Sequence, residues 1–257
     1  MNEPATPPTN SPSAPPVIPD VPAASPLLPP PPSVPINGLG GAIQALLREP
    51  RCVMAQLGQA KSASLSLTLF LIAAVCSLIY GLVTGTFSGG DQLWAAPVKI
   101  AGGLLISGLI CLPSLYIFSC LSGSRAGLGE IFGLVAGLLA LTAVLLIGFA
   151  PVAWVFSQST ESVAMMGALH LLFGLVSVGF GLRFLHNAFA QVQGQSKSGL
   201  VIWTFIFLLV ALQMTTALRP IVGKADTFFP TEKKFFLQHW ADCVDKATGK
   251  SSNYEKR

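Results

Sequence analysis

The sequence predicts an all-α fold: a polytopic membrane helix bundle with five transmembrane helices and a disordered, proline-rich N-terminal tail. The first observation behind this prediction is a series of long apolar runs separated by short polar breaks. Each run has about the 20 residues that a helix needs to cross a hydrocarbon core of roughly 30 Å. The five runs are Leu65–Thr84, Ile100–Leu121, Leu128–Phe156, Val163–Leu182 and Leu200–Val222.

The composition is the second observation, and it points to the same fold class. Only 10% of the residues are charged, 52% are hydrophobic, and the mean hydropathy is +0.65. Soluble domains carry about 25% charged residues. Because hydrocarbon offers the backbone no hydrogen-bond partners, each apolar run predicts a helix. A transmembrane barrel would need strands of about 10 residues with alternating hydrophobicity, and the sequence lacks this pattern.

Residues 1–36 form the predicted disordered tail, since they contain 14 of the 20 prolines, two acidic residues and no basic residue. Proline fixes φ and removes a backbone donor, so the tract favours polyproline II conformations. The run from Pro26 to Pro32 is suited to dock on an aromatic groove of a protein partner. The competing interpretation is a solvated spacer. A basic n-region and an apolar h-region are missing here, so we expect the first span to act as an uncleaved anchor.

Three further segments follow the tail. Residues 37–63 predict an interfacial amphipathic segment of one or two short helices, interrupted at Pro50, with a plain linker as the alternative. Residues 64–222 form the five-helix transmembrane domain. Its expected loops are Gly85–Pro97, Ser122–Gly127, Ser157–Ser162 and Arg183–Gly199. Residues 223–257 predict a C-terminal interfacial helix, with aromatic residues around Lys233 and Lys234, and then a polar tail.

The distribution of basic residues favours a cytoplasmic N-terminus in a bacterial cytoplasmic (inner) membrane. With that orientation six basic residues lie near the membrane on the inside, whereas the external loops hold only Lys99. The C-terminal flank would lie outside and adds four basic residues to that side. The preference for a cytoplasmic N-terminus therefore depends on the short loops. The six internal residues are Arg48, Arg51, Lys61, Arg125, Arg183 and Lys197. Trp94, Trp154 and Trp203 lie at expected span ends, as is typical of an aromatic belt.

Polar residues at membrane depth are the candidate functional residues, because lipid makes them costly. His170 lies near the middle of the fourth run, and Gln213 and Thr216 lie in the second half of the fifth. A buried neutral histidine can relay a proton or sense pH. It can also hydrogen-bond to a facing helix as a packing contact, which is the more common role.

Small residues predict close helix packing in the third run, where Gly133 and Gly137 form a GxxxG pair. Such pairs let helix backbones approach closely. The contact can lie within one chain, or it can join two copies of the chain in a homo-oligomer. Pro113 and Pro151 are expected to bend the second and third spans.

The sequence contains no recognisable catalytic signature. It lacks GxxxxGK[ST], HExxH and G-x-S-x-G, and its five cysteines show no zinc-like spacing. We therefore predict no catalytic residue, no cofactor and no metal. The net charge of +4 is concentrated near the ends, and no basic stripe predicts nucleic-acid binding.

Two stretches carry a family resemblance: Leu112-Pro113-Ser114-Leu115-Tyr116-Ile117-Phe118, and Gln213-Met214 through Leu218-Arg219-Pro220-Ile221-Val222-Gly223 with Phe228-Phe229. They resemble uncharacterised multi-pass membrane proteins of bacteria, over roughly residues 50–240. The proline-rich N-terminus followed by five spans also resembles the Yip (Ypt-interacting protein) superfamily in plan. Eukaryotic members of that superfamily help to organise Golgi and transport-vesicle membranes. Their Asp-Leu-Tyr-Gly-Pro and Gly-Tyr-Gly motifs are absent here, so no functional residue is carried over.

These observations favour a non-enzymatic integral membrane protein that acts as a scaffold or assembly partner. It would contact the lipid bilayer through its spans and a protein partner through residues 1–36. The alternative is a transporter or permease subunit with a path near His170 and Gln213.

Overall fold

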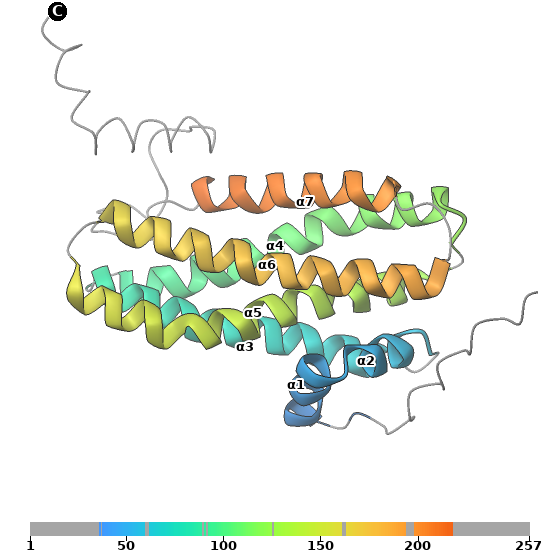
Figure 1. Cartoon of the computed structure of the whole chain (residues 1–257), viewed down its shortest axis with the longest axis horizontal. Coiled ribbons are helices and arrows are strands. Elements are labelled where there is room, and N and C mark those ends of the chain that lie inside the picture. Colours follow the sequence, from blue (N-terminus) through green and yellow to red (C-terminus); the bar gives the residue numbers. More distant parts are fainter. Residues whose placement is uncertain are drawn as a thin grey trace, which may run out of the picture. The chain divides into compact units, whose positions relative to one another are not determined.

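The computed structural model describes residues 36, 38–59, 62–88, 90, 92–124, 126–160, 163–193 and 198–217. All of these residues belong to one compact unit that starts at Pro32. The tail predicted for residues 1–36 and the C-terminal segment predicted for residues 223–257 lie outside the described residues, apart from Ile36. The described part is all-helical and contains α1 Gly38–Arg48, α2 Pro50–Leu57, α3 Ala63–Ser88, α4 Gln92–Leu121, α5 Leu128–Ser159, α6 Val163–Gln193 and α7 Ser198–Ala217 (Figure 1).

The predicted fold class is confirmed. Within the described residues, five helices are long and apolar enough to cross a membrane, and they correspond one by one to the five apolar runs. Many large apolar side chains on their outer faces are exposed, including Leu67, Ile110, Leu172 and Phe205. Side chains of this kind are compatible with lipid as the surrounding solvent. The chain is therefore built as an integral, multi-pass membrane protein.

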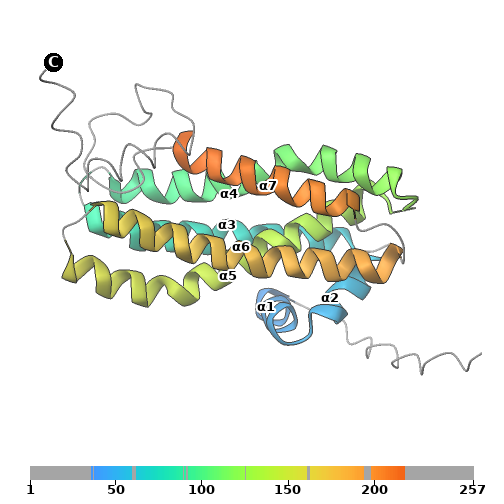
Figure 2. The ribbon, with the colours of Figure 1, turned by 45° about the horizontal axis from the view of Figure 1, so that its top comes forward.

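Helix α5 lies at the centre of the bundle, because small residues let its neighbours approach closely. It packs against α3, α4 and α6. Over its most apolar window 67% of α5 is buried, against 17% for α7, which packs against α4 at the periphery. Helix α5 thus contacts both α3 and α6, and Figures 1 and 2 show α7 lying along α4.

The turn between the first two spans is shorter than the sequence suggested. We expected a loop from Gly85 to Pro97, but α3 continues to Ser88 and α4 already begins at Gln92. Pro97 therefore lies inside α4. A membrane helix tolerates such a proline where neighbouring helices compensate for the missing hydrogen bond. Here the backbone of Pro97 packs against Gly81, where an added Cβ would come within 2.4 Å of the Pro97 Cα.

The fourth span is also longer than predicted. We expected a polar loop from Arg183 to Gly199, but α6 continues to Gln193 and only residues 194–197 separate it from α7. The additional turns are amphipathic: Phe184, Leu185 and Ala188 are buried, whereas Asn187 is exposed. Packing of this apolar face stabilises the helix beyond the end of the apolar run.

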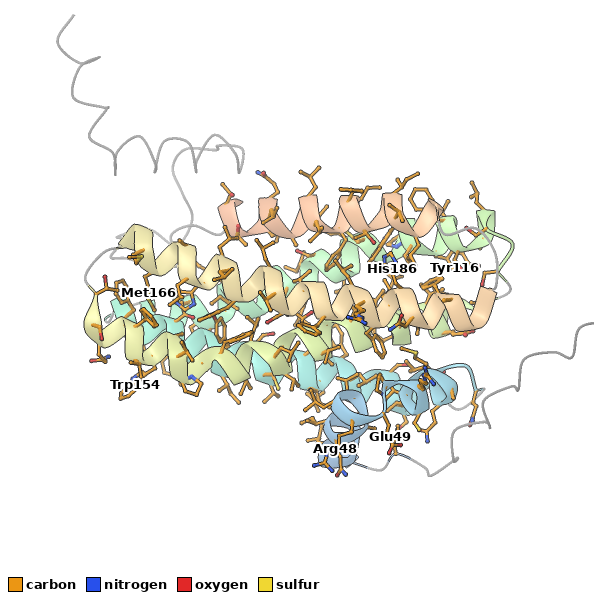
Figure 3. All side chains as sticks on the ribbon, viewed as in Figure 1. Arg48, Glu49, Tyr116, Trp154, Met166 and His186 are labelled. Atoms are coloured by element: carbon orange, nitrogen blue, oxygen red, sulfur yellow. The ribbon has the colours of Figure 1, made fainter. Side chains whose placement is uncertain are left out.

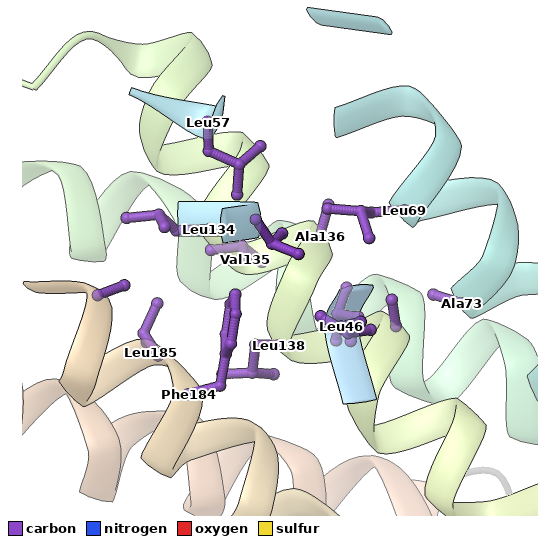
Figure 4. Close-up of a cluster of buried hydrophobic side chains, with 14 of the residues drawn as sticks. Leu46, Leu57, Leu69, Ala73, Leu134, Val135, Ala136, Leu138, Phe184 and Leu185 are labelled. Carbon is purple, nitrogen blue, oxygen red and sulfur yellow. The ribbon is translucent and has the colours of Figure 1, made fainter. Parts of the chain in front are cut away.

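The predicted interruption at Pro50 is observed. Pro50 is the first residue of α2, a position where its missing N–H costs no helical hydrogen bond. The two short helices pack against the bundle through Leu46 and Leu57, each only 1% exposed. Figure 4 shows both leucines in the main cluster of buried side chains, together with Leu69 of α3 and Leu138 of α5.

Candidate functional site

The clearest polar contact inside the membrane domain joins α3 to α6. The hydroxyl oxygen of Tyr80 lies 2.7 Å from Nδ1 of His170, and the two rings meet edge to face with centroids 5.6 Å apart. Tyr80 is 3% exposed. Because α6 extends to Gln193, His170 lies in the first third of its helix and not near the middle, as we had expected from the apolar run.

Apolar side chains from α3, α5 and α6 surround this contact and form a second buried cluster, separate from the cluster beneath α1 and α2. The rings of Phe149 and Phe173 stack within it, 4.7 Å apart and almost parallel. Figure 3 shows Met166 of this cluster near the end of the bundle that is remote from α1 and α2. The buried residues of the cluster are Tyr80, Leu146, Ala150, Ala153, Met166 and Phe173.

The other two candidate polar residues lie on a different helix. Gln213 is half-buried and Thr216 is buried on α7, which packs against α4. The Thr216 hydroxyl lies 3.4 Å from the carbonyl oxygen of Leu212 on its own helix. The structure thus places His170 in the cluster formed by α3, α5 and α6, whereas Gln213 and Thr216 belong to the outer helix.

A second, partly buried polar contact joins α6 to α7, and sequence reasoning missed it because His186 was assigned to a loop. Nε2 of His186 lies 2.8 Å from the hydroxyl oxygen of Thr204, which itself donates to the carbonyl of Leu200 at 2.8 Å. Since the Thr204 hydrogen is used in that bond, its oxygen accepts from the His186 N–H. Intrahelical bonding of this kind is usual for threonine in membrane helices.

Trp203 was expected in the aromatic belt, and that expectation is wrong. Its side chain is fully buried between α7 and α4, where Nε1–H donates to the carbonyl oxygen of Cys111 at 2.9 Å. The ring also stacks on Phe207 at a centroid distance of 5.2 Å. Trp94 and Trp154 are exposed near the same end of the bundle, as a belt requires.

The two candidate packing glycines lie in different contacts. A Cβ on Gly133 would come within 2.6 Å of the Ser66 hydroxyl and 2.7 Å of Leu57 Cδ2. A Cβ on Gly137 would come within 2.7 Å of the Phe184 ring. Both glycines therefore make close approaches within one chain, Gly133 toward α2 and α3 and Gly137 toward α6.

Lys99 is the charged residue that the sequence analysis placed wrongly. We expected it in the external loop next to the start of the second span, but α4 begins at Gln92 and Lys99 is 2% exposed within the helix. A lysine buried in a membrane segment is costly and marks a position with a structural or functional requirement. Sequence alone could have found it only by assigning Pro97 to the helix.

The outer face of α1 and α2 carries charge. Arg48, Glu49 and Arg51 are all exposed, and Figure 3 shows Arg48 and Glu49 on the side of these helices that is turned away from the bundle. Leu39 and Leu47 are half-exposed beside them. Within the described residues no three His, Cys, Asp or Glu side chains come together as metal ligands.

No protein family, curated protein or solved structure matches this chain.

Proposed function

We propose that this integral membrane protein acts as a scaffold or assembly partner, presenting its proline-rich N-terminal residues 1–36 from a fixed position on the membrane domain. One observation supports the proposal: the segment directly after the tail is anchored in the bundle. Leu46 of α1 and Leu57 of α2 are buried in the same cluster as residues of α3, α5 and α6.

The contact that anchors α2 to the bundle depends on the shapes of two residues. The side chain of Leu57 occupies the space that a Cβ on Gly133 would need, so α2 and the central helix α5 are complementary at that point. The opposite side of α1 and α2 exposes charged and apolar side chains together, which suits a surface for a protein partner. The first span would keep the tail in the cytoplasm of a bacterial cell, where a polyproline II segment can bind an aromatic groove.

The test compares three forms of the protein in native membranes by site-specific crosslinking and affinity capture. The forms are the full chain, the chain without residues 1–36, and a control with Phe205→Ala on the outer face of α7. We expect partners recovered with the full chain to be lost on deletion of the tail and kept in the Phe205 variant. An identical set of partners with and without the tail would refute the proposal.

A further inference from the structure

Arg183 is a charged residue on the outer, lipid-facing side of the bundle. It is exposed on α6, and the same side of that helix exposes the apolar side chains of Leu172, Val176 and Phe180. The sequence of α6 contains no acidic residue that could pair with the arginine. Because a charge is costly in hydrocarbon, the depth of Arg183 in the membrane decides which groups its guanidinium meets.

The exposed aromatic residues of α4 mark the two boundaries of the membrane. Trp94 is 80% exposed and Tyr116 is 36% exposed. A helix rises about 1.5 Å per residue, so these two residues are about 33 Å apart along α4. That length matches a hydrocarbon core of roughly 30 Å with an aromatic residue at each boundary. Figure 3 shows Trp154 near one end of the bundle and Tyr116 near the other.

The depth of Arg183 follows from the contact that the next residue makes with α5. A Cβ on Gly137 would come within 2.7 Å of the Phe184 ring, so these two positions lie at the same level of the bundle. Gly137 is about 26 Å from Trp154 along α5. Arg183 therefore lies just inside the boundary marked by Tyr116, toward the end of the bundle that holds α2. From there its long side chain can extend into the headgroup layer.

Two neighbours of Arg183 lie on the same face of α6. Asn187 is one turn nearer the membrane surface and Gly179 is one turn deeper, and both are exposed. A Cβ on Gly179 would meet nothing within 4 Å, so the helix surface there is open to lipid. This face thus combines two side chains that donate hydrogen bonds at the level of the headgroups with an unobstructed apolar surface beneath them.

We propose that Arg183 and Asn187 bind the phosphate group of an anionic phospholipid in the leaflet next to α2, with one acyl chain lying along Gly179. A guanidinium group donates two parallel hydrogen bonds to phosphate oxygens, and the amide of Asn187 donates another. Since α6 carries an arginine and no acidic residue, it favours a headgroup of net negative charge over one that also carries an ammonium group. This site lies on a different helix from the tail and the partner surface of α1 and α2.

The experiment uses the full chain in phosphatidylcholine nanodiscs with increasing fractions of phosphatidylglycerol that carries a photoreactive diazirine in one acyl chain. Peptide mass spectrometry locates the adducts. We expect labelling of residues 172–187 to saturate, and Arg183→Gln to raise the half-saturating fraction about tenfold, because it removes the charge-assisted hydrogen bonds. Arg48→Gln is the control, since it removes an exposed charge of α1 and should leave the saturation curve unchanged.

Gly179→Leu is the second variant, because it keeps the arginine but fills the surface along which the acyl chain would lie. We expect it to weaken the saturable labelling of α6 as well. Photoreactive phosphatidylcholine should label α6 only in linear proportion to its fraction, as expected of lipid that surrounds the protein without a specific site. The same curve for both lipids would overturn the proposal, and so would Arg183→Gln or Gly179→Leu chains that saturate like the unaltered protein. An equal loss in Arg48→Gln would show general charge attraction and would overturn it too.

Discussion

Single glycines decide how closely the membrane helices approach, and Gly81 is the most constrained of them. A Cβ at this position would lie 2.4 Å from the Pro97 Cα and 3.0 Å from its nitrogen, and backbone atoms cannot rotate away. We therefore expect Gly81→Ala to destabilise the protein by about 1–3 kcal/mol, the usual cost of overpacking. The measurement is the midpoint of thermal unfolding in detergent, which should fall by at least a few degrees.

Gly102 provides the matched control, because a Cβ there meets nothing within 4 Å although the residue lies in the adjoining helix α4. Gly102→Ala should leave the midpoint unchanged or raise it slightly, since alanine restricts the unfolded chain. Equal midpoints for the two variants would contradict the close α3–α4 contact.

Cys52 gives a prediction about pH at the outer face of α2. Its thiol donates to a Glu49 carboxylate oxygen at 3.2 Å. This hydrogen bond raises the pKa of Cys52 above its usual value, with smaller contributions from desolvation and from the negative charge of Glu49. Because only the thiolate is nucleophilic, Cys52 should react slowly with maleimide near neutral pH. Glu49→Gln should increase the rate and shift the pH–rate profile toward lower pH.

The measurement uses a chain with Cys120→Ala and Cys243→Ala, in which Cys76 and Cys111 are buried within the bundle. Arg51→Gln is the control, since it also removes a charged neighbour of Cys52 but leaves the Glu49 carboxylate in place. A pH–rate profile that Glu49→Gln leaves unmoved would show that the carboxylate does not hold the thiol proton.

Among the helices, the docking of α2 is the contact on which the proposed presentation of the tail depends. Leu57→Ala would remove a side chain that is 1% exposed and contacts the surface at Gly133. Large-to-small changes in a core cost about 2–5 kcal/mol. We expect this loss to open α1 and α2 locally, so that trypsin cleaves after Arg48 and Arg51 at least tenfold faster.

Leu47→Ala is the control for this prediction, because Leu47 is 49% exposed on the neighbouring helix. Its cleavage rate should match that of the unaltered protein. If both leucine variants are cleaved at the same rate, α1 and α2 are not seated through Leu57.

The sequence predicted the five spans because hydrophobicity over about 20 residues needs no knowledge of tertiary contacts. It missed their ends where packing overrides composition. Pro97 can lie within α4 because Gly81, which has no side chain, leaves space for the backbone of Pro97. The polar end of α6 stays helical because Phe184 and Ala188 are buried. These contacts are made between residues far apart in the chain.

The candidate site was predicted only in part, for the same reason. His170 was recognised because an ionisable residue in an apolar run is conspicuous. Its partner Tyr80 is 90 positions away, and a tyrosine in a membrane helix carries no signal of its own. The role of Trp203 was likewise unpredictable, since the same residue suits an interfacial belt or a buried contact with the carbonyl of Cys111.

For the chain as a whole, the prediction concerns which end of the bundle faces the cytoplasm. Three spans, α3, α4 and α5, separate Cys52 from Thr160, so these two residues lie on opposite sides of the membrane. Cys52 lies on α2, at the end where α3 begins, whereas Thr160 follows the last residue of α5 at the other end. The basic residues of the short loops favour the side of Cys52 as cytoplasmic. We predict that a charged, membrane-impermeant maleimide added to intact bacteria labels Thr160→Cys and spares Cys52.

Two chains without Cys120 and Cys243 are needed, one keeping Cys52 and the other carrying Cys52→Ala with Thr160→Cys. In inverted membrane vesicles the result should reverse, so that Cys52 is labelled and the cysteine at position 160 is protected. The alkylation is run above neutral pH, because Glu49 suppresses the thiolate of Cys52. Labelling of both cysteines from the same side would contradict an odd number of spans between them, and labelling of Cys52 alone in intact cells would reverse the orientation.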